Sequence, residues 1–236
     1  MLKRETLKVL VENFGMKYSE VLGIRLETGR EGEIFKWFLA AVLFGAPIRE
    51  NSAIKTYRCF QKHRVLTPER ILKTGWDGLV RILDEGGYTR YDFKTAYKLL
   101  EVTQNLMETY DGKLTLVHEK ASDPADLEAK LKSLGKGVGD VTVNIFLREL
   151  RSVWVKAKPN PTGIVVLAAK NLEIIREENA EKVLHQLEKF WEQNGVADKS
   201  FINFESALIR LGKDFCRKRK CPLCPVKEQC VCIRHV

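Results

Sequence analysis

Residues 131–147 read LKSLGKGVGDVTVNIFL, and this stretch decides the fold. Leu131 and Leu134 are spaced to lie on one face of a helix, and the apolar pattern from Val141 onwards predicts a second helix. Three glycines fall within five residues between them. They predict a tight turn, because glycine tolerates positive φ angles and close backbone approach. The stretch therefore predicts two helices joined by a glycine-rich turn.

The start of the second helix is a candidate anion site. Its first N–H groups have no acceptor inside the helix, and the helix dipole is positive at this end. Such a turn can hold a phosphate group through its backbone. A plain helix–helix turn closed by glycine is the alternative interpretation. The residues expected to contact phosphate here are Gly135, Gly137, Val138, Gly139, Thr142 and Lys132.

Composition favours a polyanionic partner. The 236 residues suffice for one large domain or two modest ones. Lys and Arg number 40 against 31 Asp and Glu, a net charge of +9. This balance suits nucleic acid or anionic lipid, although it is also compatible with simple solubility. No apolar run is long enough to span a bilayer and no secretory signal is evident. We therefore expect a soluble intracellular protein without a membrane partner.

Helical periodicity dominates the rest of the chain, and strand signals are scarce. The pattern predicts an all-α protein of about ten short helices. Residues 164–172 fit either a strand or a helix. Within 90–114 we expect a long helix that ends near Asp111–Gly112. The other expected helices are 33–44, 50–63, 67–75, 76–87, 123–134, 141–150, 177–195 and 201–216.

Five of the six cysteines crowd into the end of the chain. Their spacing is Cys216-x4-Cys221-x2-Cys224-x5-Cys230, with Cys232 as an alternative fourth ligand to Cys230. A set of this kind in an intracellular protein indicates a [4Fe–4S] cluster or zinc rather than disulfides. Cys59 stands alone on an apolar helix, and we expect it in the core.

Four cations lie between the first two of these cysteines: Arg217, Lys218, Arg219 and Lys220. Positive neighbours lower the pKa of a thiol, so they should favour the thiolate form that binds metal. They also form a basic loop, which we expect to contact DNA phosphates.

Together, the glycine hairpin and the cysteine tail resemble the endonuclease III branch of the helix-hairpin-helix DNA glycosylases, which carries a C-terminal iron–sulfur loop. The resemblance extends to three further segments: FKWFLAAVLFGAPIRENSAIKTYRCF (35–60), ILDEGGYTRYDFKTAYKLL (82–100) and ALIRLGKDFC (207–216). It implies [4Fe–4S] in preference to zinc.

The resemblance also implies an architecture of two helical lobes. One is a six-helix barrel over 28–150 that contains the hairpin (131–147), and the other combines 1–27 with 151–236 around the cluster. DNA would lie in the cleft between them. Members of the family flip a damaged nucleotide out of the duplex and cleave its glycosidic bond, and some cut the strand as apurinic/apyrimidinic (AP) lyases. The implied partner is double-stranded DNA with damaged or abasic sites. The protein would be a monomer in the cytoplasm, beside the nucleoid.

The usual catalytic pair of the family is missing. Val141 stands where bifunctional members have the Schiff-base lysine, and the hairpin is one residue longer. The segment KPNPTGIVV (158–166) lacks the family aspartate, whose place falls on Asn160, Pro161 or Thr162 depending on the alignment. The first cysteine spacing is x4 where the family has x6.

These departures are expected to weaken catalysis of base excision most, since a carboxylate stabilises the cationic sugar of that reaction. AP-lyase chemistry asks only for an unprotonated amine near the sugar aldehyde. Lys136 is the first candidate and Lys158 the second, with Lys132 and Lys156 also near the expected cleft. Each of these lysines has a simple phosphate contact as its alternative role. Asp140 or Glu149 are candidates for a substitute carboxylate.

The sequence thus predicts a base-excision-repair enzyme, foremost an AP lyase with or without glycosylase activity. One alternative is a monofunctional N-glycosylase that removes a damaged or mismatched base. Another is a protein that binds lesions without turnover. A zinc-tailed binding module with an unrelated helical fold is a more distant alternative.

Overall fold

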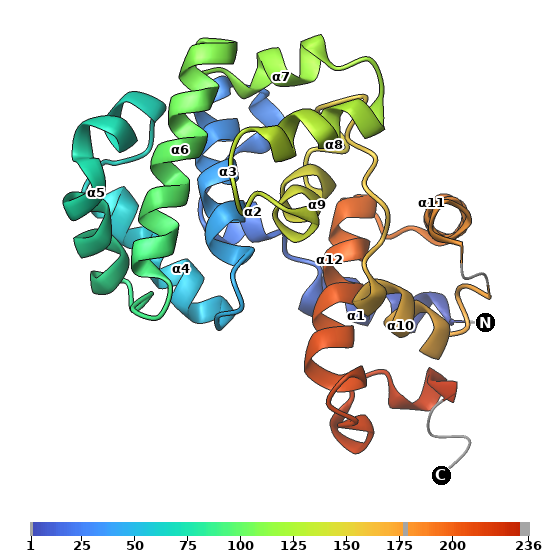
Figure 1. The fold of residues 1–236 in the computed structure, drawn as a ribbon. Coiled ribbons are helices and arrows are strands. Elements are labelled where there is room, and N and C mark those ends of the chain that lie inside the picture. Colours follow the sequence, from blue (N-terminus) through green and yellow to red (C-terminus); the bar gives the residue numbers. More distant parts are fainter. Residues whose placement is uncertain (1, 177–178, 232–236) are drawn as a thin grey trace. The chain divides into compact units, whose positions relative to one another are not determined.

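The computed structural model describes residues 2–176 and 179–231, which contain helices α1 to α12 and no β-strand (Figure 1). The all-α prediction is therefore confirmed. The chain divides into two compact units, Met1–Val21 with Asn160–Val236 and Leu22–Pro159. A search of the described residues finds no helix with the length and apolar character needed to cross a membrane.

The division falls at 21/22 and 159/160, whereas the sequence placed it at 27/28 and 150/151. Hydrogen bonds explain the shift. Gln61 Nε2 donates to the carbonyl of Leu22 at 3.3 Å, which ties the start of 22–27 to the Leu22–Pro159 unit. Lys156 ties the segment 151–159 to the same unit, because its ammonium donates to the carbonyl of Ala121 at 2.6 Å.

The Leu22–Pro159 unit is built around α3, whose apolar face is buried. Trp37 and Phe38 of α3 have almost no exposed surface. Trp37 Nε1 donates to the carbonyl of Phe146 at 3.0 Å, and the ring of Phe38 meets that of Phe146 edge-on at 5.1 Å. The elements of this unit are η1 (Leu26–Thr28), α3 (Glu31–Phe44), α4 (Glu50–Lys62), α5 (Pro68–Glu85), α6 (Asp92–Tyr110), α7 (Leu114–Lys120), α8 (Pro124–Ser133) and α9 (Asp140–Arg148).

Two elements of this unit, α5 and α7, differ from the sequence expectation. The helices expected at 67–75 and 76–87 form one element, α5, kinked at Gly75 (φ 65°, ψ 178°). The helix expected to end near Asp111–Gly112 does so: α6 ends at Tyr110, where Asp111 adopts a left-handed conformation with φ 50°. The chain then starts α7 at Leu114, a helix that the periodicity did not reveal.

The other unit contains α1, α2 and the last three α-helices. Residues 164–172, which fitted strand or helix, form the helix α10. The helix expected over 177–195 is present from Ala180, and residues 177–178 lie outside the described part. The elements are α1 (Arg4–Phe14), α2 (Tyr18–Val21), α10 (Gly163–Asn171), α11 (Ala180–Asn194), α12 (Phe201–Leu211), η2 (Gly212–Cys216), η3 (Cys221–Leu223) and η4 (Lys227–Gln229).

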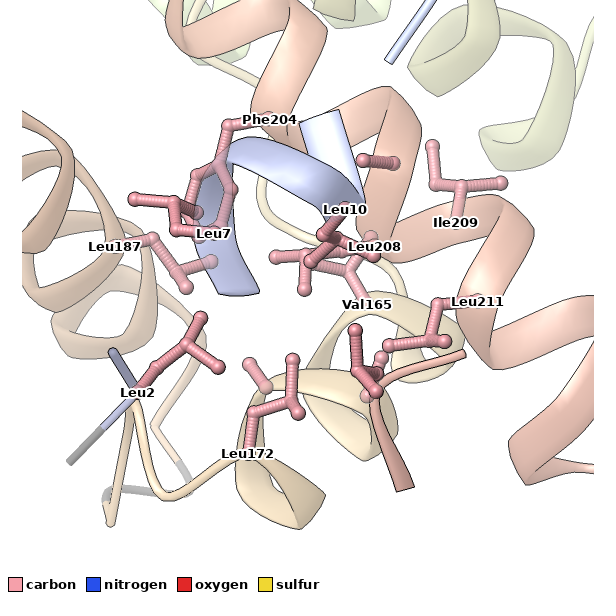
Figure 2. Packing of buried hydrophobic residues seen from close by; sticks show 14 of the residues in the cluster. Leu2, Leu7, Leu10, Val165, Leu172, Leu187, Phe204, Leu208, Ile209 and Leu211 are labelled. Atoms are coloured by element: carbon pink, nitrogen blue, oxygen red, sulfur yellow. The ribbon is translucent and has the colours of Figure 1, made fainter. Parts of the chain in front are cut away.

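Figure 2 shows the core of this unit, in which side chains from four helices meet. Leu7 of α1, Leu187 of α11 and Phe204 of α12 are fully buried there. Each buried side chain of this size stabilises the fold by about 1.5 to 3 kcal/mol relative to leaving it exposed. Arg210 of α12 caps the end of α1, since its guanidinium donates to the carbonyl of Phe14 at 2.6 Å.

Candidate nucleic-acid interface and cysteine pocket

The glycine-rich stretch forms the predicted hairpin of two helices, α8 and α9. Asp123 caps the start of α8 by accepting from the N–H of Asp126 at 2.8 Å. Two apolar side chains, Leu134 and Val138, are buried and hold the turn against the protein. The N–H of Val138 donates to the carbonyl of Gly135 at 3.2 Å, which closes the turn.

Gly137 brings the hairpin turn against α6. Its φ of +90° lies in the region that favours glycine. A Cβ at this position would lie 2.6 Å from Cε and 3.2 Å from Nζ of Lys98. The end of the Lys98 side chain therefore lies against the turn. Glu101, one helical turn further along α6, accepts from the N–H of Lys136 at 2.9 Å.

The start of α9 carries a set of unused donors. In the part of the chain that the structure describes, the N–H groups of Gly139, Asp140, Val141 and Thr142 donate no hydrogen bond. The N-cap residue, Gly139, is extended, and a Cβ there would meet nothing within 4 Å. The positive end of the helix dipole lies at the same place. This geometry can accept an anion such as a phosphate oxygen.

Two of the expected phosphate contacts do not offer side chains to a ligand. Val138 and Thr142 are each only 3% exposed. The Thr142 hydroxyl occupies the space next to Gly45, in the segment that follows α3. Sequence spacing alone does not show this, because the covering segment lies far away along the chain. The N–H of Val138 is also occupied by the carbonyl of Gly135, whereas the N–H of Thr142 has no acceptor among the described residues.

Lys132 and Asp140 form an ion pair across the hairpin. Their Nζ and Oδ1 atoms are 2.5 Å apart, and the Asp140 side chain is 89% exposed. The hydrogen bond from Lys132 lowers the pKa of Asp140, and the bond to Asp140 raises the pKa of Lys132. Asp140, the proposed substitute carboxylate, is therefore ionised and paired at the mouth of the turn.

The remaining lysines separate into distinct roles. Lys136 is exposed on the turn itself, and Lys158 is exposed on the segment that precedes α10. Lys156, expected near the cleft, instead closes the end of α7. Its ammonium donates to the carbonyls of His118 at 2.7 Å, Glu119 at 3.3 Å and Ala121 at 2.6 Å. A lysine held in this way is a structural cap.

Lys98 is a candidate that sequence reasoning missed. Burial lowers its pKa, and repulsion from Lys94 one turn away lowers it further. A lysine with these surroundings is more easily deprotonated and is therefore a better nucleophile than an exposed one. The i, i+4 spacing of the two lysines is visible in the sequence. The burial is not, because it comes from packing around α6.

The four expected ligands of the cysteine tail lie around one small pocket. Cys224 and Cys230 are each 7% exposed, and Cys216 and Cys221 are half-buried. Cys232, the alternative fourth ligand, lies outside the described residues. No three His, Cys, Asp or Glu side chains in the described part are arranged so that they could hold a metal ion as they stand. The residues lining the pocket are Asn171, Phe215, Cys216, Cys221, Cys224, Lys227 and Cys230.

The short elements of the tail explain this arrangement. The π-helix η2 ends at Cys216, η3 begins at Cys221, and η4 directly precedes Cys230. The N–H of Lys220 donates to the carbonyl of Phe215 at 3.0 Å and folds the intervening loop back. The solitary Cys59 is buried in α4, as predicted.

The predicted effect of the basic loop on the thiols is wrong for Cys224. Burial raises the pKa of Cys224, and the neighbouring Cys221 raises it further. The cations cannot offset this burial, because all four side chains of 217–220 are exposed to solvent. Lys218 is partly neutralised by Asp214, with Nζ and Oδ1 3.2 Å apart. The loop thus presents its charge outward, as a surface for a polyanion would.

No family model matches the chain, and no curated protein matches it in sequence. Among solved structures, it is similar to the 3-methyladenine DNA glycosylase MagIII of H. pylori, which was crystallised with 1,N6-ethenoadenine. The TM-score is 0.53 at 13% sequence identity, over 93% of this chain and 99% of that one. The likeness shows that this chain has the all-α fold of that glycosylase.

Proposed function

We propose that the protein is a base-excision-repair enzyme that acts on double-stranded DNA at damaged or abasic sites. The observation that carries this proposal is the start of α9, where four N–H groups have no acceptor among the described residues and the exposed Lys136 lies on the preceding turn. Backbone donors at a helix start hold a DNA phosphate without reading sequence, which suits an enzyme that must act anywhere in a genome. The fold supports the proposal, since a DNA glycosylase shares it.

The activity we propose first is that of an AP lyase. A neutral lysine amine attacks C1′ of the ring-opened abasic sugar, and water leaves to give an imine. Loss of a proton from C2′ then expels the 3′ phosphate and breaks the strand. Lys98 fits the nucleophile best, because burial against the hairpin favours its neutral form. Lys136, the choice from sequence, and Lys158 are the other candidates.

The test is borohydride trapping on a duplex with one abasic site. Wild-type protein is expected to give a covalent complex and a strand break on the 3′ side. Lys98→Gln should abolish both, while Lys136→Gln and Lys158→Gln retain trapping. Lys55→Gln, at an exposed position on α4, is the matched control. Loss of trapping in Lys136→Gln alone would move the nucleophile to the turn. Absence of trapping and cleavage in the wild type would exclude the lyase.

A monofunctional glycosylase is the second candidate, and two observations favour it. The similar structure is a 3-methyladenine glycosylase. In addition, Asp140 offers an ionised, exposed carboxylate next to the phosphate site. A carboxylate of this kind stabilises the oxocarbenium character of base release. This activity predicts release of methylated or etheno bases, with strand breaks only after alkali, and its loss in Asp140→Asn.

We further propose that the cysteine pocket holds a [4Fe–4S] cluster, with zinc as the alternative. The donors fit either group, since four thiols from one short segment line one pocket and two of them are buried. When bound, either group would tie η2, η3 and η4 together. Cys216, Cys221, Cys224 and Cys230 would hold it, and residues 217–220 would be fixed as an exposed basic loop.

A further inference from the structure

Helix α6 carries an exposed pair of aromatic side chains. Phe93 and Tyr97 lie one turn apart and are 56% and 65% exposed. The ring of Trp76 on α5 backs both of them, with centroids 5.1 Å from Phe93 and 5.6 Å from Tyr97. Large aromatic side chains are mostly buried in folded proteins, and a cluster left in solvent commonly marks an interaction site.

This cluster sits on a rigid base. Helices α5 and α6 pack along each other (Figure 1), and the kink at Gly75 places Trp76 at the start of the second half of α5. The indole Nε1 is covered and has no hydrogen-bond partner among the described residues. The cluster therefore presents ring surface and offers no indole donor to a ligand.

A row of lysines runs beside the aromatic pair. Lys94 and Lys98 each directly follow an aromatic residue, so the two pairs form neighbouring i, i+4 rows along α6. Lys98 lies against Gly137 in the hairpin turn. One helix face thus connects the exposed rings with the place where a phosphate is proposed to bind.

We propose that Trp76, Phe93 and Tyr97 form a stacking surface for unpaired nucleobases of the DNA strand held by the hairpin. The inference rests on the proposed function, and it deepens that function by assigning a contact to bases rather than phosphates. Stacking on aromatic rings is tolerant of sequence because every base has a π face. The exposed Lys94 beside the rings favours a nucleic acid over an apolar protein surface, since it supplies charge for the backbone of the same strand.

The test compares three DNA ligands by fluorescence anisotropy: a twelve-residue oligothymidylate, a duplex with a central unpaired bubble, and the fully paired duplex. Phe93→Leu/Tyr97→Leu keeps apolar bulk and removes the rings. It is expected to weaken binding of the first two ligands at least about tenfold, as base–aromatic stacking energies imply. Binding of the paired duplex should change less than about twofold. Val155→Ala, at a valine that is 73% exposed, is the matched control.

The possible outcomes are distinguishable. If the wild type binds none of the three ligands, the proposed function fails and this inference fails with it. If the wild type binds and the double variant is unchanged on all three, only the stacking surface is overturned. An equal loss on all ligands counts against stacking as well. An unchanged thermal unfolding midpoint confirms that the variant is folded, and Phe93→Tyr should keep full binding because it retains the ring.

Discussion

Gly137 and Gly139 occupy the same turn and yet do different things. Gly137 needs a positive φ of +90° and is crowded by the Lys98 side chain. Gly139 has φ −99° and ψ −172°, a conformation open to any residue, and faces empty space. The first glycine is therefore required by the fold. The second is required only if a ligand must approach the backbone closely.

This difference gives a paired prediction. Gly137→Ala should lower the free energy of unfolding by about 1 to 2 kcal/mol, because the added Cβ is strained and meets Lys98. Gly139→Ala should leave unfolding unchanged within about 0.5 kcal/mol and still weaken DNA binding. Urea titration and anisotropy with a duplex measure the two effects. Unchanged binding in Gly139→Ala would argue against a phosphate at the start of α9.

For single residues, the sequence predicted the features that depend on neighbouring residues in the chain. It missed the burial that comes from packing against segments remote in sequence. The glycine turn is local and appears in the structure as expected, and the four closely spaced cysteines line one pocket, although metal binding there stays a prediction. The side chain of Thr142 is buried next to Gly45, which is remote in sequence, so its burial could not be foreseen. The same holds for Lys98, whose altered pKa depends on burial that no helical pattern on α6 alone reveals.

Helix α7 shows how one side chain stabilises an element. Its last carbonyls have no partners inside the helix, and Lys156 supplies three N–H donors to that end. Lys156→Met should lower the free energy of unfolding by about 1 to 2 kcal/mol, since charged hydrogen bonds to a helix end are lost. Lys158→Met removes an exposed charge two residues away and is the control for urea titration. An equal effect of both substitutions would show that α7 is not capped this way.

The contact between the C-terminal ends of α4 and α5 predicts a pH effect. Lys62 and His63 each hydrogen-bond to Glu85 at 2.6 Å and lower the pKa of this carboxyl from 4.5 to about 2. A lowered pKa in the folded state stabilises the protein above pH 4.5, and this stabilisation is lost as pH falls towards 2.

Comparison of wild type with Glu85→Gln isolates this contribution. The wild type should be the more stable protein at pH 6, and the difference should shrink steadily between pH 4.5 and 2, the two pKa limits. Thermal unfolding at a series of pH values measures it. A difference that stays constant over this range would mean that the ion pairs do not form in solution.

Helices could be predicted from the sequence wherever the hydrophobic periodicity and the helix-breaking residues indicated the same boundaries. Residues 164–172 fitted both periods because the run is apolar from Ile164 to Ala169, and the residues form the helix α10, with Val165, Ala168 and Ala169 buried in the core. Gly75 ended the first helical pattern as expected, although the chain resumes its helix immediately as a kinked α5. The stop at Asp111–Gly112 was predicted, but the seven residues of α7 that follow it are too few to show a helical period.

At the scale of the whole molecule, the chain begins in one compact unit, passes through the other, and returns to complete the first. The unit made of Met1–Val21 and Asn160–Val236 joins two distant segments, and α1 from the first is buried against α12 from the second. Hydrophobic periodicity identifies both helices and not their pairing. The family resemblance supplied a discontinuous unit, and the hydrogen bonds of Gln61 and Lys156 set where the other unit begins and ends.

The cysteine pocket allows a test at this scale, because it belongs to the discontinuous unit alone. If it holds a cluster, Cys224→Ser should remove the bound metal and destabilise that unit, since metal binding is coupled to folding. Cys59→Ser, at the buried cysteine of α4, should keep the metal and is the matched control.

Metal analysis and visible absorption of protein purified without oxygen separate the candidates: iron with broad absorption supports [4Fe–4S], and colourless protein with one zinc supports the alternative. Wild-type protein without either metal would contradict both assignments, while the lyase and binding tests on the hairpin would still stand.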